Sequence, residues 1–325
     1  MTGRLGQRRI LLFWLPLALT WVMMACEQPY ITAIVARLPE TTENLAAFGI
    51  AFSIAILVEA PVIMMLGAAT GLAHPRPSYL RLRIFTFALN GIITLVMALL
   101  LTTPAIDLVT APFDPRVAEL VEGALLICLP WPGAIGFRRF YQGVIIRHDR
   151  ARLVTLTTVI RLAAMSLTCL LLFTQESIPG AYVGAGGLSL AVSLEAVAAF
   201  LLSRRARSRV LALPGEPITY REIAHFYYPL ALTAVVALTI HPLVNFMVEG
   251  SRLDRQSLAV IPVVNALGFL FRSQGLAFQE VAISLAGEGE AHRPELTRFA
   301  LVMGLGLGGL MAFVVFTPLG PLWFE

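Results

Sequence analysis

Residues 13–20 read FWLPLALT, and residues 226–233, 213 positions later, read FYYPLALT. Further matches follow at that offset or within one residue of it: Pro29 with Pro242, Leu45-Ala46 with Leu258-Ala259, and Thr103-Pro104 with Thr317-Pro318. Chance gives one Pro-Leu pair, but not a collinear series of matches. The series therefore predicts an internal repeat, in which the last third of the chain echoes its beginning.

The composition is that of a protein embedded in a membrane. Hydrophobic residues make up 58% of the 325 residues and charged residues only 14%, whereas soluble domains carry about 25% charge. The apolar residues come in blocks of twenty or more, long enough to cross a hydrocarbon core of about 30 Å as helices. We predict an all-α polytopic membrane protein with nine spans, at 10–36, 44–72, 84–103, 117–146, 152–174, 180–203, 219–249, 256–287 and 296–320.

The first apolar segment admits a second interpretation. Arginines at positions 4, 8 and 9 before an apolar run could mark a signal peptide, and MMAC at 23–26 resembles a weak lipobox. The apolar run continues to about Ala36, however, which is longer than the apolar region of a signal peptide. We therefore predict a first transmembrane helix.

Arginines gather in alternate loops, namely at 4–9, 76–83, 147–152, 204–209 and 293–298. The opposite loops hold only Arg37, Arg116, Arg252 and Arg255, mixed with acidic residues. Cytoplasmic loops carry the excess of basic residues, so the pattern predicts a cytoplasmic N-terminus in a bacterial-type inner membrane.

The repeat and the orientation together predict two lobes. Six spans separate the repeated segments, so both copies cross the membrane in the same direction, as parallel repeats do. We expect a six-helix lobe at 1–203, a basic cytoplasmic linker at 204–217 and an incomplete three-helix lobe at 218–325. Two complete lobes would need about 430 residues, twice the offset, so we expect either a fragment or a partner that completes the second lobe.

Two parallel lobes that each begin with an aromatic-x-x-Pro-Leu helix resemble the MATE/MOP superfamily of exporters and lipid-precursor flippases. The likeness is greatest to the progressive ankylosis branch, linked to pyrophosphate export. It rests on four short motifs: CEQ at 26–28, LAAFGIAFS at 45–53, YPLAL at 228–232 and HPLVN at 241–245.

The resemblance implies a substrate cavity between the lobes, lined mainly by the first, second, seventh and eighth spans. Many bacterial members of the superfamily carry a coupling Asp in the first span. This chain instead has Glu27, about a turn earlier, which leaves both H⁺ and Na⁺ open as the coupling ion.

Glu27 and Gln28 lie in the outer half of the first span, just before Pro29. A charged group at membrane depth costs at least about 2.5–3.5 kcal/mol and usually faces the protein interior. Proline removes a backbone hydrogen bond and loosens the helix there. A carboxylate at such a kink could exchange a proton or hold Na⁺, so Glu27 with Gln28 is the predicted ion-coupling site. The alternative is a neutral, hydrogen-bonded structural Glu.

Glu59 lies near the middle of the second span, and its repeat-related position is Arg272 in the eighth. Opposite charges thus occupy equivalent positions on two helices that we expect to face the cleft. An ion pair is strong when dry and weak when hydrated, because its Coulomb energy falls as the dielectric rises. The two residues are the predicted gate. Alternatively, each pairs within its own lobe.

A third group lies about two turns from the predicted cytoplasmic ends of the fourth, fifth and sixth spans. It consists of Arg138, Arg139, Arg161 and Glu195. Three arginines against one acid leave surplus positive charge, which would suit an anionic substrate or lipid headgroups. The alternative is a structural Arg161–Glu195 pair, with one of the two neighbouring arginines snorkelling to the interface.

His241 and Asn245 lie one turn apart near the predicted kink of the seventh span. They could form a polar wall of the cavity. A lone intramembrane histidine can equally be a hydrogen-bonded structural residue.

Enzyme motifs are absent from the sequence: it has no HExxH, GxSxG, GxxxxGK[ST] or CxxC. Its glycine-rich stretches at 184–187 and 304–309 lie in or beside apolar spans, which favours close helix packing over phosphate binding. We expect no metal and no cofactor other than the coupling ion, and no nucleic-acid partner. The predicted function is ion-coupled export of a small-molecule, anionic or lipid-linked substrate by alternating access. A lipid-linked precursor flippase and a non-transporting membrane scaffold are the alternatives.

Overall fold

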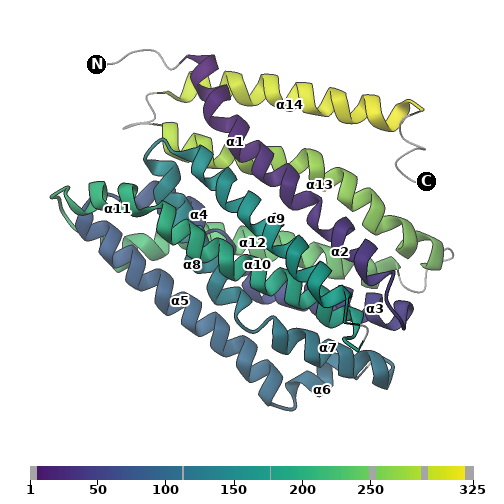
Figure 1. Ribbon diagram of the computed structural model, residues 1–325. Coiled ribbons are helices and arrows are strands. Elements are labelled where there is room, and N and C mark those ends of the chain that lie inside the picture. Colours follow the sequence, from purple (N-terminus) through teal and green to yellow (C-terminus); the bar gives the residue numbers. More distant parts are fainter. Residues whose placement is uncertain (1–5, 112, 176, 249–253, 287–291, 319–325) are drawn as a thin grey trace. The chain divides into compact units, whose positions relative to one another are not determined.

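The computed structural model describes residues 6–111, 113–175, 177–248, 254–286 and 292–318, without the side chains of 240–248 and 254–266. Within these ranges the chain forms helices joined by short turns, and no strand (Figure 1). Two compact units divide the chain. The large unit is Cys26–Ile240, and the small unit is Met1–Ala25 with His241–Glu325.

The large unit contains ten complete helices and most of an eleventh in its described part. They are α2 (Glu27–Val35), α3 (Thr41–Ile63), α4 (Met65–Leu72), α5 (Arg76–Thr102), α6 (Ala105–Thr110), α7 (Pro115–Ile127), α8 (Trp131–Arg147), α9 (Ala151–Phe173), α10 (Gly180–Leu202), α11 (Arg204–Leu211) and α12 (Tyr220–Val248). Helices α9 and α10 lie side by side along their length, with α8 packed against both (Figure 1). These three helices form the centre of the unit and carry eight of the 17 polar residues that are buried in its described part.

Among the residues that the structure describes, eight segments are long and apolar enough to cross a membrane. They are Gln7–Val35, Thr41–Leu72, Arg76–Thr102, Pro115–Arg147, Ala151–Phe173, Gly180–Leu202, Tyr220–Thr239 and Arg293–Phe316. Each coincides with one of the nine predicted spans, and the remaining prediction, 256–287, falls on α13 (Asp254–Leu285). The chain is a multi-pass, all-α membrane protein, as predicted.

Three of these spans are interrupted, at Cys26, Met64 and 128–130, and each interruption has a proline in it or within three residues of it. The first breaks at Cys26, between α1 (Gln7–Ala25) and α2, and Pro29 occupies the first turn of α2. Proline has no N–H to donate, but the first residues of a helix need no intrahelical acceptor. The chain can therefore start a new helix at Glu27, which confirms the predicted loosening of the helix at this point.

The second span breaks at Met64, three residues after Pro61 in α3. The Pro61 carbonyl accepts a hydrogen bond from the hydroxyl of Tyr227 in α12. Tyr227 also packs edge-on against Phe85, with ring centroids 5.5 Å apart. The start of α12, which carries the repeated motif, is thus anchored to the interrupted second span.

The predicted basic linker is ordered. Its first half forms α11, which buries Ala206 and Val210. The segment after α11 follows the start of α5, where Arg81 donates a 2.9 Å hydrogen bond to the carbonyl of Ile218. Arg76 N–H likewise donates to the Leu213 carbonyl at 3.2 Å.

Small residues let helices of the large unit approach closely. A Cβ added at Gly143 in α8 would lie 2.6 Å from the Leu66 carbonyl oxygen of α4, and one added at Gly187 in α10 would lie 2.3 Å from Cys169 Sγ of α9. Close approach through small residues is typical of membrane helices. Packing through the glycines at 184–187 is thus confirmed. At Gly304 and Gly308 no described atom comes within 4 Å of such a Cβ, so close packing there stays a prediction.

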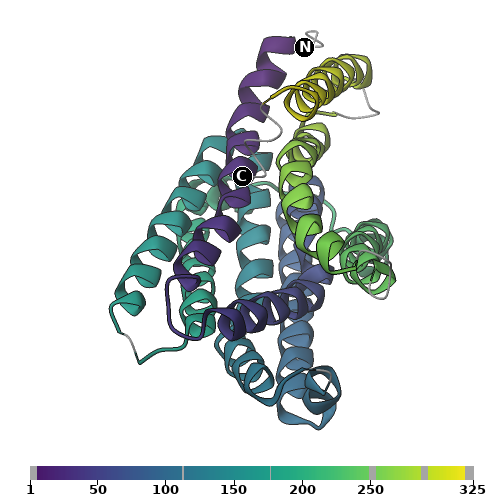
Figure 2. The same ribbon diagram turned by 90° about the vertical axis from the view of Figure 1, so that its right-hand side faces the viewer.

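The small unit contains α1, α13 and α14 (Arg293–Phe316), drawn purple, light green and yellow in Figure 2. Trp14 of α1 donates a 3.2 Å hydrogen bond to the Gln274 carbonyl of α13 and packs edge-on against Phe299 of α14. Trp21 packs in the same manner against Phe269. The first helix thus groups with the eighth and ninth spans, whereas we predicted domain limits at 203 and 217. The predicted two-lobe division stays a prediction.

Candidate functional site

Four charged side chains meet inside the large unit, one from each of four helices. They are Glu27 of α2, Arg138 of α8, Arg161 of α9 and Glu195 of α10. Each is between 0% and 4% exposed, so the cluster is separated from the surface by protein on all sides. We call these four residues the ion-pair network.

Glu195 is the most fully bonded member of the network. Its Oε2 accepts a hydrogen bond from Arg138 and lies 3.5 Å from Arg161 Nη1. Its Oε1 accepts from the amide of Gln142 at 3.0 Å, and the hydroxyl oxygens of Thr157 and Thr158 lie 3.3 and 3.2 Å from it. A buried carboxylate requires donors of this kind on both oxygens, because it has lost its hydration.

Glu27 is bonded on one oxygen only. Its Oε2 accepts a hydrogen bond from Arg161 Nη2 at 2.5 Å. Its Oε1 is buried and has no hydrogen-bond partner in the described part of the chain. Two buried glutamates thus share one arginine, and only Glu27 has an oxygen left to bind something else. The neighbouring Gln28 is half-buried.

Two sites that the sequence predicts as separate are in contact in the structure. Arg161 was assigned to the inner basic cluster and Glu27 to a separate coupling site, yet the two are in direct contact. The alternative Arg161–Glu195 pairing is also present, at 3.5 Å. The snorkelling arginine is wrong: Arg138 and Arg139 are only 1% and 5% exposed, because α8 is surrounded by α4, α5, α9 and α10.

The surplus positive charge predicted for this region is balanced. Arg138, Arg139 and Arg161 carry three formal positive charges. Glu27, Glu59 and Glu195 carry three formal negative charges, and all three act electrostatically on Arg161. The cluster is therefore close to neutral as a whole, which explains how six ionisable groups are tolerated in an apolar bundle.

Glu59 of α3 has a partner in its own unit. Its carboxylate accepts a hydrogen bond from the indole Nε1 of Trp131, the first residue of α8, and both side chains are buried. Arg272 lies in α13 of the small unit and is exposed. The two predicted gate residues thus belong to different units, and their pairing stays a prediction.

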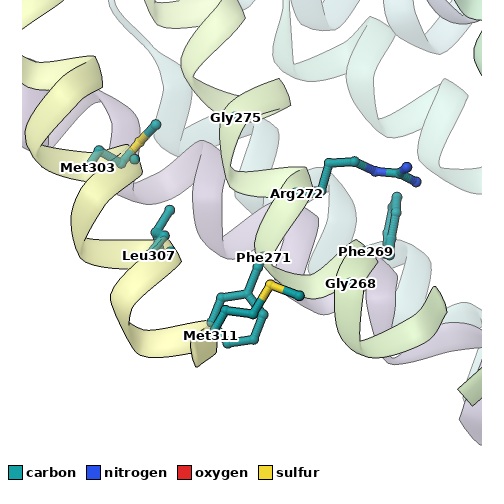
Figure 3. Close-up of a pocket in the computed structure, with 10 residues that line it drawn as sticks. Gly268, Phe269, Phe271, Arg272, Gly275, Met303, Leu307 and Met311 are labelled. Atoms are coloured by element: carbon teal, nitrogen blue, oxygen red, sulfur yellow. The ribbon is translucent and has the colours of Figure 1, made fainter. Parts of the chain in front are cut away.

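Arg272 borders a pocket of about 470 Å³ formed by α13 and α14 alone. Figure 3 shows Arg272 and Phe269 extending from α13, while Met303, Leu307 and Met311 extend from α14. The lining is apolar apart from Arg272, and it contains none of the acidic residues of the predicted sites. His241 and Asn245 fall in α12, but their side chains lie outside the described residues.

Sequence reasoning missed Gln142, Thr157, Thr158 and Trp131. Their signal was available, because Arg138 and Gln142 are four residues apart on α8, and Thr157 and Arg161 four apart on α9. Residues at that spacing share a helix face. Polar residues on the faces that carry Arg138 and Arg161 could thus have been grouped with them before the structure was known.

Comparison with solved structures decides the fold. No protein-family model matches the sequence, and no curated protein matches it either. Among solved structures, an outward-facing multidrug resistance MATE family transporter of the MOP superfamily superposes with a TM-score of 0.78, covering 98% of this chain and 73% of that protein. The fold is the MATE fold.

Two further MATE-fold structures agree. A MOP superfamily transporter from Pyrococcus furiosus, described by the reversed polarity of its binding pocket, gives a TM-score of 0.73 over 98% of this chain and 74% of its own. A MATE protein in complex with Br-NRF gives 0.71 over 98% and 76%. The sequence identities to the three are 16%, 17% and 17%, so the MATE fold is shared without close sequence similarity.

Proposed function

We propose that this MATE-fold protein is an ion-coupled secondary exporter in which Glu27 binds the coupling ion. One observation carries the assignment. Glu27 is a buried carboxylate at a break in the first span, and it has one bonded and one unbonded oxygen. A buried, half-bonded carboxylate is stabilised by a proton or a small cation, since either one completes its interactions.

The helix break supplies further ligands of the same kind. Pro29 has no N–H for the carbonyl four residues before it, and unwound backbone carbonyls coordinate cations in broken transporter helices. Glu27 Oε1 together with such carbonyls would form an oxygen site suited to Na⁺. A proton on the same carboxylate is the other choice, and in both cases the ion adds one positive charge beside Arg161.

Alternating access completes the proposal. The predicted parallel lobes would expose the site to either side of an inner membrane in turn, with the N-terminus in the cytoplasm. Glu59 and Arg272 remain the proposed gate, and His241 with Asn245 a proposed polar wall of the cavity. The likeness of the short motifs to the progressive ankylosis branch supports a small anionic solute as substrate.

The transported substrate distinguishes the exporter from the flippase alternative. An exporter moves a soluble solute against an ion gradient in proteoliposomes, whereas a flippase moves lipid only. A scaffold without transport is favoured by no feature of the large unit, because a scaffold gains nothing from an unbonded buried carboxylate oxygen.

Glu27→Gln tests the proposed role of Glu27, because it keeps the shape and removes the charge. In proteoliposomes with an imposed pH or Na⁺ gradient, we expect the variant to lose gradient-driven export of a fluorescent organic ion, by at least tenfold. Asp107→Asn, an exposed acid on α6, serves as the matched control and should transport like the unchanged protein. Undiminished gradient-driven transport by Glu27→Gln would show that Glu27 does not bind the coupling ion.

A further inference from the structure

We propose that Arg161 is an internal counterion, which pairs with Glu27 when the ion site is empty and transfers to Glu195 when the coupling ion binds. The inference rests on the proposed function, because it takes Glu27 as the ion-binding residue. It adds the partner that competes with the ion and the place where that partner goes. Arg161 is a positioning residue in this scheme and does not itself touch the transported solute.

The guanidinium of Arg161 already spans both carboxylates. Its Nη2 lies 2.5 Å from Glu27 Oε2, and its Nη1 lies 3.5 Å from Glu195 Oε2. The first is a charge-assisted hydrogen bond, while the second is an ion pair longer than a normal hydrogen bond, so Nη1 has no hydrogen-bond partner among the described residues. A small movement of one side chain would therefore exchange the tight contact for the loose one.

Glu195 is built to receive the arginine. Its Oε1 is held by Gln142 and the threonines, and its Oε2 is bonded to Arg138, so the carboxylate is fixed in place whether Arg161 approaches or not. A carboxylate oxygen can accept from two donors at once. Arg161 can thus bond to Glu195 Oε2 without displacing Arg138.

Charge explains why the exchange follows ion binding. A proton or Na⁺ on Glu27 neutralises the carboxylate, and Arg161 then loses the charge that holds it there. The other acids that act on Arg161 are Glu195 and Glu59, and Arg138 and Arg139 act on the same two carboxyls. Glu195 is the one acid of these that is already within 4 Å, so Arg161 moves toward it, keeping its own proton throughout.

The physical benefit is that no charge in the network is ever left alone. Removing the partner of a buried carboxylate is strongly destabilising, because the remaining charge is uncompensated. With Arg161 in place, Glu27 is paired with a cation in both states: the arginine in one and the coupling ion in the other. Loading and release of the ion would then cost far less than they would at an isolated glutamate.

The test is whether Glu27 controls the coupling between Arg161 and Glu195. Thermal unfolding of the full chain in detergent would be measured for single and double Gln substitutions at Arg161 and Glu195. The same set would then be measured in the Glu27→Gln background, which mimics the ion-loaded site. The coupling is the part of the melting-temperature change that is not additive between the two sites.

We expect the Arg161–Glu195 coupling to at least double in the Glu27→Gln background. The matched control is the Arg138–Glu195 pair, whose coupling should change less, because Arg138 acts on Glu27 without a direct hydrogen bond. A structural role for Arg161 alone would give the same coupling in both backgrounds. An Arg161–Glu195 coupling that stays the same or falls would overturn the proposal.

A structure of the single variant Glu27→Gln covers the case in which the double variants do not fold. We expect Arg161 Nη1 to lie about 2.9 Å from Glu195 Oε2, a normal hydrogen-bond distance. Arg161 remaining on residue 27, with Glu195 at its present distance, would reject the transfer. These measurements do not involve transport, so their outcome is independent of the transport test. If Glu27→Gln transports normally, the coupling and the structure still decide whether Arg161 transfers to Glu195.

Discussion

Glu27 and Glu195 are the same residue type, at similar burial, with different surroundings. Glu195 is surrounded by side chains of α8 and α9 that were placed by the regular spacing of those helices. Glu27 lies in the first turn of a helix that starts at a break, and among the described residues only Arg161 is hydrogen-bonded to its carboxylate. The difference in bonding follows from local helix geometry, and the proposal that Glu27 rather than Glu195 binds the ion rests on it.

Two histidines at the ends of membrane spans predict how the stability of the protein changes with pH. Burial, followed by the nearby charge of Arg147, lowers the pKa of His74. Burial also lowers the pKa of His148, followed by its proximity to His74 and to Arg209. Each histidine is thus neutral in the folded protein at pH values where the unfolded chain has begun to take up a proton.

The direction of the pH dependence of stability follows from this difference in histidine pKa between the folded and the unfolded chain. Above the unfolded pKa of about 6.5 the histidines contribute no pH dependence. As the pH falls below that value the unfolded state binds more protons than the folded state, so stability decreases. We expect the melting temperature to fall between pH 7 and pH 5, and His148→Gln to reduce that fall. His225→Gln, at an exposed position of α12, is the control. An equally steep profile in His148→Gln would contradict the prediction.

At the scale of helices, interruptions and close crossings shape the site. Breaks at Cys26 and Met64 divide the first and second spans, and each has a proline within three residues. The close crossing of α8 over α4 at Gly143 fixes where α8 lies, and with it the depth of Arg138 and Gln142. Glycines, which carry no functional group, thus position the charged and polar side chains of the site.

Gly143→Ala tests this crossing. The added Cβ would lie 2.6 Å from the Leu66 carbonyl oxygen, a backbone atom that cannot move away without shifting α4. Overpacking of this kind costs about 1–3 kcal/mol, so the melting temperature should fall by several degrees. Gly91→Ala on α5 is the matched control, because nothing described lies within 4 Å of its added Cβ. It should be neutral or slightly stabilising, since alanine favours helix over glycine. Equal effects of the two substitutions would show that the crossing tolerates a side chain.

At the scale of the whole molecule, the chain shares the MATE fold over nearly all of its length while sharing few residues with the proteins compared. The sequence repeat relates the first span to α12, and Tyr227 within the repeated motif is bonded to the second span. The repeated motif is therefore recognisable in the sequence, and its second copy takes part in the packing of the large unit.

The proposed gate is tested at this scale. Glu59 and Arg272 belong to different units. As a gate, we propose that they pair in one conformational state and separate in another. A double-mutant cycle with Glu59→Arg, Arg272→Glu and the swap would measure gradient-driven transport and thermal stability. We expect the swap to recover part of what each single change loses, because breaking a desolvated pair costs on the order of 3–5 kcal/mol. A swap as damaging as the sum of the two singles would show that the residues never meet.

The sequence by itself determined the membrane location of the helices and their approximate ends, because apolar segments of twenty residues are properties of the chain order. The MATE fold was suggested by the resemblance of short motifs, and the solved structures confirmed it. The sequence also picked out Glu27, Arg138, Arg161 and Glu195, since a charge at membrane depth is costly enough to stand out. It did not show which of them touch. Glu27 and Arg161 are 134 positions apart, and the rotation of each helix about its own axis decides whether they meet. That rotation is set by contacts such as Gly143 on Leu66 and Gly187 on Cys169, which exist only once the helices have packed.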